Sequence, residues 1–155
     1  MVRCAIVGLG RWGQTLVNSV QGKSDKIRFV RGVTRTPRNA ATFAADHGFP
    51  LDSDFEAALA DPKVDAVVLA TPHSAHAAQI MAAAKVKKHV FVDKPVTITR
   101  DSAVKSVAAA KKAGIVLAAG HNRRFLPALH EIKLLIDDGA LGTILHLEGN
   151  TSGPG

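Results

Sequence analysis

Short apolar runs alternate with helical patterns along almost the whole chain of 155 residues. The first run, Val2–Val7, is nearly continuous in apolar residues, which is typical of a parallel strand covered on both faces. Segment 11–21 follows with apolar side chains at helical spacing, and 64–71 is the clearest of the later buried runs. This repetition predicts an α/β fold, a doubly wound parallel sheet with helices on both faces and right-handed crossovers.

Turn and cap signals set the expected bounds of these elements. Pro37 opens the second helix in its first turn, and Gly48 closes it. Ser53 is expected to cap the third helix, with Glu56 three residues on completing a capping box. Gly114 ends the fifth helix. The expected strands span 2–7, 27–34, 49–52, 64–71, 90–93 and 115–120, and the expected helices span 11–21, 37–48, 53–62, 74–85 and 99–113.

The region after residue 122 has a different pattern. Pro127 begins a helix with Leu129, Ile132 and Ile136 along one face. Residues 143–147 then predict a strand, which is followed by a tail rich in Gly and Pro. We therefore expect one domain at 1–122, and at 123–155 the linking helix and first strand of a truncated second domain. Such a fragment is expected to expose apolar faces and to self-associate through them.

Composition excludes several classes of protein. The formal charge of +7 comes from scattered basic residues, and one Trp, six Phe and no Tyr leave little for base stacking, so no nucleic-acid partner is expected. No apolar stretch is long enough to cross a bilayer, so no membrane partner is expected either. The single cysteine, Cys4, lies in an apolar run, which predicts a buried inert thiol. Without a disulfide framework, we expect a reducing, cytoplasmic location.

The segment GLGRWG, residues 8–13, is the strongest local motif because it directly follows the first strand and opens the first helix. In a dinucleotide-binding turn of this kind, Gly8 allows the tight turn and Gly10 lets a pyrophosphate approach the backbone. Gly13 lets the helix pack closely on the strand, and free N–H groups at the helix start, around Arg11 and Trp12, hold the phosphates. Without a ligand, the segment would be only a glycine-rich turn.

The end of the second strand bears on the choice of nucleotide. An NAD-specific site places a carboxylate there for the ribose 2′-hydroxyl, but this chain has Thr34 and Arg35 in that place and no acid. Arg35 is suited to pair with a 2′-phosphate, Thr34 to donate its hydroxyl, and Arg38 to assist. We therefore expect NADP(H) as the preferred cofactor, with NAD(H) as the alternative; otherwise these arginines are simply solvated.

Three further strands end in polar residues at the same edge of the predicted sheet. The fourth ends in ATPHSAH (70–76), the fifth in FVDKPV (91–96) and the sixth in GHNRRF (120–125). The carboxyl ends of parallel strands meet the glycine loop at this edge. Lys94, between an acid and a proline, is a candidate to orient or protonate a substrate oxygen. His73 and His76 are three residues apart with no third ligand beside them, so no metal is expected.

The ordered set GLGRWG, ATPHSAH, VDKPV, GHNRRF and LGTILHLEG resembles the N-terminal Rossmann domain of the glucose–fructose oxidoreductase / inositol dehydrogenase / rhizopine catabolism (Gfo/Idh/MocA) family. The resemblance covers almost the whole chain. It implies that Lys94 is the lysine of the family's E-K-P motif, near the nicotinamide and the substrate hydroxyl. It also implies that Thr71, Pro72 and His76 line the cofactor cleft and that Asn122 lies near the nicotinamide.

Three departures from the family pattern stand out. Asp93 replaces the usual glutamate of E-K-P, which shortens its reach to the ribose by one methylene. Thr34 stands where many members carry aspartate. Members also continue into a second α/β domain that supplies the substrate pocket, a histidine and an aspartate near the reacting carbon, and the oligomer surface.

The resemblance implies an NAD(P)-dependent oxidoreductase. It would transfer hydride between nicotinamide and a hydroxyl or carbonyl carbon of a sugar, polyol or similar small molecule, with Lys94 at the substrate oxygen. The full-length protein would be a homo-oligomer, and the 155-residue chain alone would bind cofactor without turnover. The alternative is a non-catalytic NADP(H)-binding module that acts as a sensor or partner subunit.

Overall fold

The computed structural model describes residues 1–150, so the predicted Gly/Pro tail lies almost entirely outside the described residues. The chain divides into a unit of Met1–Gly120 and a second unit that begins at His121. Each unit is described by itself.

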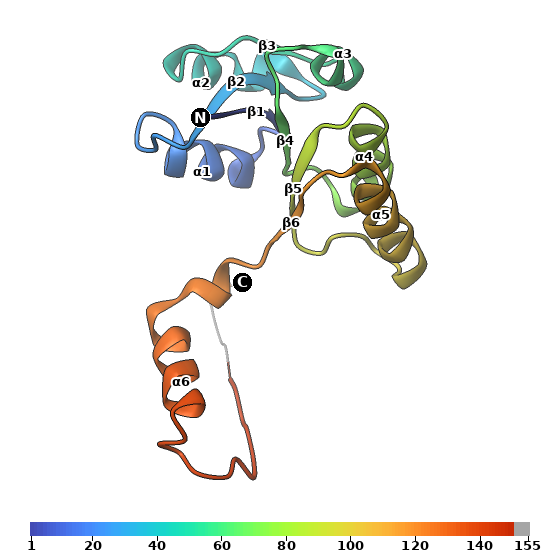
Figure 1. Ribbon diagram of the computed structural model, residues 1–155. Coiled ribbons are helices and arrows are strands. Elements are labelled where there is room, and N and C mark those ends of the chain that lie inside the picture. Colours follow the sequence, from blue (N-terminus) through green and yellow to red (C-terminus); the bar gives the residue numbers. More distant parts are fainter. Residues whose placement is uncertain (151–155) are drawn as a thin grey trace. The chain divides into compact units, whose positions relative to one another are not determined.

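The first unit is built on a parallel sheet whose strand order is β3-β2-β1-β4-β5-β6 (Figure 1). Every neighbouring pair of strands runs parallel. The chain builds the sheet outward from β1 to β3, then returns beside β1 and continues to β6, so the strand order reverses between β1 and β4. The strands are β1 (Val2–Val7), β2 (Ile27–Val33), β3 (Leu51–Asp52), β4 (Ala66–Leu69), β5 (His89–Asp93) and β6 (Leu117–Gly120).

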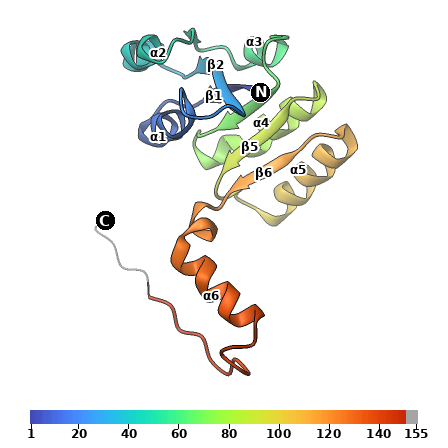
Figure 2. The same ribbon diagram turned by 60° about the vertical axis from the view of Figure 1, so that its left-hand side comes forward.

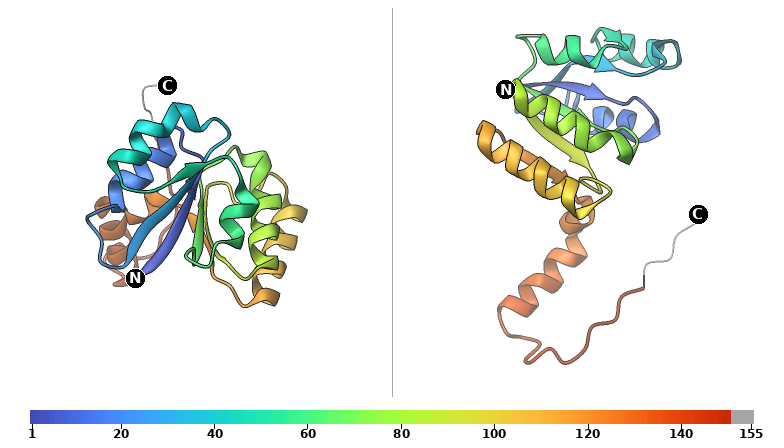
Figure 3. Two further views of the ribbon diagram at one scale, coloured as in Figure 1. Left: turned by 90° about the horizontal axis from the view of Figure 1, so that it is seen from above. Right: turned by 90° about the vertical axis from the view of Figure 1, so that its right-hand side faces the viewer.

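Helices cover both faces of this sheet, as the sequence predicts (Figure 3, left). One face carries α1 and α2, and the other carries α3, α4 and α5. Helix η1 is a short 3₁₀ turn that leads into α2, so the expected helix 37–48 is divided in two. The helices are α1 (Arg11–Val20), η1 (Pro37–Ala40), α2 (Ala41–Asp46), α3 (Phe55–Ala60), α4 (His73–Lys85) and α5 (Arg100–Ala113).

Alternate residues of the central strands feed two separate cores. On the α1 side, Ile6 packs in a cluster with Val17 and Phe29. On the α4 side, Val67 packs with Ile80. Because side chains alternate along a strand, a strand covered on both faces needs apolar residues at every covered position, and this explains why all four buried residues of β1, Cys4 to Val7, are apolar.

Local capping agrees with the sequence at α5 and differs at α3. Thr99 caps α5 and exchanges hydrogen bonds with Ser102, and Gly114 ends the helix with φ of 70°. The predicted cap of α3 by Ser53 is wrong, because the cap is Asp54, whose carboxylate accepts a hydrogen bond from the Ala57 amide at 3.0 Å. An aspartate caps a helix as well as a serine does, so the two adjacent candidates could not be separated from sequence alone.

The thiol of Cys4 is buried in β1, which confirms the prediction of a buried cysteine. Burial raises the pKa of this thiol to about 11, with a smaller contribution from the negative charge of Asp65. A thiol that stays protonated at neutral pH is a poor nucleophile, so Cys4 serves packing.

The second unit contains a short helix and one longer helix (Figure 2). These are η2 (Asn122–Phe125) and α6 (Pro127–Asp137), which confirms the helix predicted from Pro127. The predicted strand at 143–147 is wrong, because those residues are exposed and irregular. A strand is stable only beside a partner strand, and within residues 121–150 none is present.

Candidate nucleotide and substrate site

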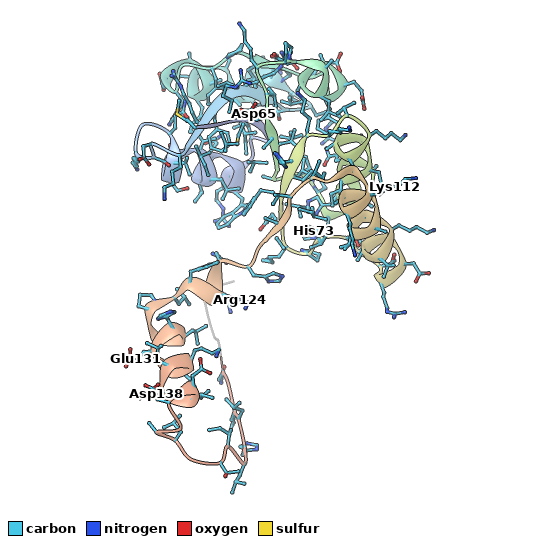
Figure 4. All side chains as sticks on the ribbon, viewed as in Figure 1. Asp65, His73, Lys112, Arg124, Glu131 and Asp138 are labelled. Carbon is cyan, nitrogen blue, oxygen red and sulfur yellow. The ribbon has the colours of Figure 1, made fainter. Side chains whose placement is uncertain are left out.

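The candidate site lies at the carboxyl edge of the first unit's sheet, where the strand order reverses between β1 and β4. Open parallel sheets bind ligands at such a reversal, because the loops that follow the two strands diverge there. Figure 4 labels His73 on the carboxyl edge, where α4 begins, and Asp65 on the opposite edge, just before β4.

The three glycines of the loop after β1 differ in what a side chain would meet. Gly8 has φ of 93°, and a Cβ there would lie 2.5 Å from the Ala70 carbonyl oxygen. A Cβ on Gly13 would lie 1.9 Å from the Gly8 carbonyl oxygen. By contrast, no described atom lies within 4 Å of a Cβ built on Gly10. The fold itself therefore requires Gly8 and Gly13, whereas the space at Gly10 is open.

The start of α1 offers backbone donors beside that open space. Gly10 is the N-cap residue, and no side chain caps the helix within the described part of the chain. The first turn contains no acidic residue. Gln14 fixes the loop, because its side-chain amide donates to the Leu9 carbonyl at 3.1 Å and its backbone amide donates to the Gly10 carbonyl at 3.0 Å. The free N–H groups and the positive end of the helix dipole suit a phosphate.

The loop after β2 carries the residues predicted to select the nucleotide. The Thr34 amide donates to the Asp52 carbonyl at 3.0 Å, which holds this loop against β3. The carboxylate of Asp52 accepts from the Arg31 guanidinium at 2.5 Å. Arg35 is exposed and has no hydrogen-bond or ion-pair partner among residues 1–150. The Asp52 carboxylate is therefore paired with Arg31, while Arg35 is available.

Arg31 was not identified from the sequence, although it governs the charge of this loop. It bridges Asp52 and Asp61, the latter at 3.0 Å. The hydrogen bond from the Lys63 amide and the pairing with Arg31 lower the pKa of Asp61. Its only sequence signal is a second arginine, after Arg28, in a strand that is otherwise apolar; a cation that is half-buried there requires acidic partners.

The loop after β4 contains Thr71, Pro72 and His76. Thr71 is half-buried and donates from its hydroxyl to Gln79 Oε1 at 2.6 Å. His76 is fully buried, and its two ring nitrogens lie 2.9 Å from the Pro95 carbonyl oxygen and 3.0 Å from the Thr71 carbonyl oxygen. The sequence analysis did not identify Gln79, because a glutamine on an alanine-rich helix is normally expected to face solvent.

Lys94 directly follows β5, at the same edge. Its side chain is exposed and, in the described range 1–150, makes no ion pair or hydrogen bond. Asp93 before it is half-buried. The structure thus brings the loops of the glycine motif, Thr71 and Lys94 to one edge of one unit. Asn122 belongs to the second unit, where it begins η2 and is exposed.

His73 and His76, the two histidines three residues apart at the start of α4, were weighed as metal ligands from the sequence and no metal was expected there. The rings of His73 and His76 are 5.6 Å apart between centroids, and both nitrogens of His76 face carbonyl oxygens. Over residues 1–150, no group of three or more potential ligands surrounds a possible ion position.

Comparison with known proteins agrees with this geometry. The family model described as "Oxidoreductase family, NAD-binding Rossmann fold", that of the Gfo/Idh/MocA proteins, matches residues 2–121. The chain belongs to this family. Its first unit is accordingly an NAD-binding Rossmann domain, and the resemblance stated from the sequence motifs is confirmed.

The relatives of this chain include enzymes that are named for different substrates. It is 35% identical to the scyllo-inositol 2-dehydrogenase (NAD(+)) of Bacillus subtilis, over 99% of this chain and 45% of the relative. It is 31% identical to the 2,7-anhydro-N-acetylneuraminate hydratase of Escherichia coli, over 99% of this chain and 40% of the relative. A putative NADPH-dependent oxidoreductase from Desulfitobacterium hafniense superimposes with a TM-score of 0.84 at 32% identity, covering 91% of this chain and 40% of that one.

The chain spans less than half the length of these relatives. None of the helices described for residues 1–150 has the length and apolar character needed to cross a bilayer.

Proposed function

We propose that this chain binds NADP(H) at the carboxyl edge of its sheet and contributes Lys94 to an oxidoreductase reaction. The substrate would be a sugar, a polyol or a similar small molecule that bears a hydroxyl or carbonyl carbon. The bound nicotinamide would supply the hydride chemistry, and the chain's own residues would bind, orient and move a proton.

The open space at Gly10 is the observation that carries this proposal. A methyl group at Gly10 would meet no described atom, so the polypeptide gains no packing from the glycine. Glycine also costs backbone entropy relative to alanine. A small residue that the fold does not need, beside an uncapped helix start, is what close approach of a pyrophosphate requires.

The remaining cofactor contacts are assigned to polar groups that lie at the same edge of the sheet. Amides at Arg11, Trp12 and Gly13 would hold the pyrophosphate. Asp93 would reach toward the ribose with a shorter arm than the family's glutamate. These assignments, together with those of Thr71 and Pro72, are supported by their position at one sheet edge.

The loop after β2 supports a preference for the 2′-phosphate. Arg35 is exposed and unpaired within residues 1–150, and the neighbouring Asp52 carboxylate is paired with Arg31, which it shares with Asp61. A guanidinium pairs with phosphate oxygens through two parallel hydrogen bonds, whereas an anionic carboxylate in this loop would repel them.

Lys94 is suited to act at the substrate oxygen. An exposed ammonium without a local partner can donate a hydrogen bond to a hydroxyl or carbonyl oxygen and exchange a proton with it. The dehydrogenase relative acts on scyllo-inositol by its name, which supports a polyol as substrate class. The hydratase relative shows that product analysis must accompany any redox assay.

Titration of Trp12 fluorescence with NADPH and with NADH tests the proposal. Trp12 lies in the glycine loop with 39% of its surface exposed, so a bound reduced nicotinamide nucleotide should quench it. We expect saturable binding of NADPH that is tighter than that of NADH. Arg35→Ala should weaken NADPH binding by about tenfold, or about 1.4 kcal/mol, and leave NADH binding almost unchanged.

Each other outcome has a defined meaning. Equal binding of both nucleotides would remove the NADP preference and retain the nucleotide site. Absence of binding by both would contradict the proposed site. Lys94→Ala should leave both dissociation constants almost unchanged, because its proposed role is at the substrate.

A further inference from the structure

His76 is fully buried at the beginning of α4, yet both of its ring nitrogens have polar partners. Nδ1 lies 2.9 Å from the Pro95 carbonyl oxygen, and Nε2 lies 3.0 Å from the Thr71 carbonyl oxygen. A carbonyl oxygen only accepts hydrogen bonds, so a ring with hydrogen on one nitrogen donates to one of the two oxygens, and a ring that makes both bonds at once carries hydrogen on both nitrogens. The ring therefore lies within hydrogen-bond distance of two backbone segments that are not adjacent in sequence.

These two segments carry different parts of the candidate site. Thr71 lies in the loop that follows β4. This loop borders the glycine loop, since a Cβ on Gly8 would touch the Ala70 carbonyl oxygen. Pro95 follows Lys94 directly in the chain. No side-chain interaction within residues 1–150 holds Lys94, so its position depends on the backbone around it.

Helix α4 holds the Thr71 segment at a second point. Gln79, three residues after His76 on the same helix, accepts a hydrogen bond from the Thr71 hydroxyl at 2.6 Å. The Thr71 hydroxyl is therefore bound to α4 through Gln79, and the carbonyl oxygens of Thr71 and Pro95 both lie within hydrogen-bond distance of His76 on the same helix.

We propose that His76 is a positioning residue that sets the spacing between the Thr71 segment and the backbone of Lys94. The proposal deepens the proposed function and rests on it for the role of Lys94. Direct contact of the His76 ring with a cofactor is disfavoured, because the side chain is fully buried and both nitrogens are engaged.

Two amide substitutions separate the two hydrogen bonds. The side-chain amide nitrogen of asparagine is one bond from Cγ, as Nδ1 of histidine is. That of glutamine is two bonds from Cγ, as Nε2 is. His76→Asn should therefore retain the Pro95 bond and lose the Thr71 bond, and His76→Gln should do the reverse. His76→Phe keeps an apolar ring in the cavity and removes both donors.

Two readouts follow the two segments. Backbone order parameters from ¹⁵N relaxation report the Lys94 and Val96 amides, and the dissociation constant for NADPH, from Trp12 fluorescence, reports the Thr71 side. We expect order parameters near about 0.85 in the wild-type chain and in His76→Asn, but below about 0.6 in His76→Gln and His76→Phe. We expect about 2- to 10-fold weaker NADPH binding in His76→Asn and His76→Phe, which is the range for one lost hydrogen bond.

The pattern across the variants decides the inference. If His76→Asn and His76→Gln affect both readouts equally, or if His76→Phe changes neither, the positioning role is wrong. A general loss of stability would move both readouts together, so it cannot produce the opposite pattern expected for Asn and Gln. Should the wild-type chain fail to bind NADPH, the proposed function fails, while the order parameters still decide whether His76 fixes the Lys94 backbone.

Discussion

In the glycine loop, Gly8 and Gly13 are needed by the fold itself, whereas Gly10 is the residue proposed to admit the ligand. Gly13→Ala would bring a methyl group to 1.9 Å from the Gly8 carbonyl oxygen, so α1 would have to move. We expect this change to cost about 3 kcal/mol of stability, as overpacking against backbone does. Gly10→Ala meets nothing within 4 Å and should fold normally, yet weaken NADPH binding by at least about tenfold, because the methyl group occupies the approach of the pyrophosphate.

Thermal unfolding and Trp12 fluorescence measure these two effects on the same samples. Gly149→Ala is the matched control, since a Cβ there also meets nothing within 4 Å and Gly149 is not among the glycines with positive φ. If Gly10→Ala binds NADPH as tightly as the wild type, close backbone approach at this position is not part of binding.

Residue-level prediction from sequence succeeded where backbone geometry demands a residue type. Only glycine fits the positive φ of Gly8 and the close contact at Gly13, so the loop could be located without a structure. The burial of His76 and the bond from Thr71 to Gln79 could not be found, because both depend on how α4 lies against β4 and β5. Spacing along a helix does not reveal which loop a side chain will face.

At the scale of elements, Arg3 and Asp65 join the beginnings of β1 and β4 at the edge opposite the site. The Asp65 carboxylate accepts hydrogen bonds from the Arg3 guanidinium at 2.7 and 2.9 Å, and from its backbone amide at 2.8 Å. The side-chain and backbone hydrogen bonds from Arg3 lower the pKa of Asp65 from 3.8 to about 2. The folded chain therefore binds this proton less readily than the unfolded chain.

The sign of the pH effect follows directly. Stability from this pair is fully present above about pH 4 and is lost as the pH falls toward about 2, because the unfolded chain takes up the proton first. The pair is partly exposed, with 42% and 36% of the two side chains accessible, so solvent screens it and its contribution is small. Asp65→Asn should flatten this part of the stability profile, as measured by urea unfolding between pH 5 and pH 2.

A double-mutant cycle with Arg3→Met isolates the pair from other acids. Asp61 also has a lowered pKa and adds its own pH dependence in the same direction, so it stays unchanged in all four proteins. A wild-type profile parallel to that of Asp65→Asn would show that the pair does not favour folding at neutral pH.

Helices and strands could be predicted from sequence where the residues that stabilise them are close together in the chain. The buried strands and the helices between them follow from apolar runs and period, and the structure confirms their order. Strand β3 has only two residues and exists because Gly32 and Val33 of β2 lie beside it. The segment 143–147 is also short and rich in apolar residues. No neighbouring strand is present in the described residues, so the segment remains irregular.

For the whole molecule, stability should be divided unevenly between the two units. The sheet of the first unit is built on residues with no exposed surface, such as Ala5, Ile6 and Val67. Helix α6 in the second unit has no buried residue. Regions with little burial open locally, whereas core strands exchange their amide protons mainly through global unfolding.

Hydrogen exchange measured by mass spectrometry should therefore show two classes of amide. We expect protection in β1 and β4 to exceed that in α6 by at least about 100-fold, given a typical global stability of about 5 kcal/mol or more. NADPH at about 100 times its dissociation constant should add about 2.7 kcal/mol to the core strands, or about 100-fold slower exchange, because it binds only the folded site. Exchange in α6 should not change. If α6 instead matches β1 in protection and responds equally to NADPH, then α6 unfolds together with the Rossmann domain. The two units would then form one cooperative structure.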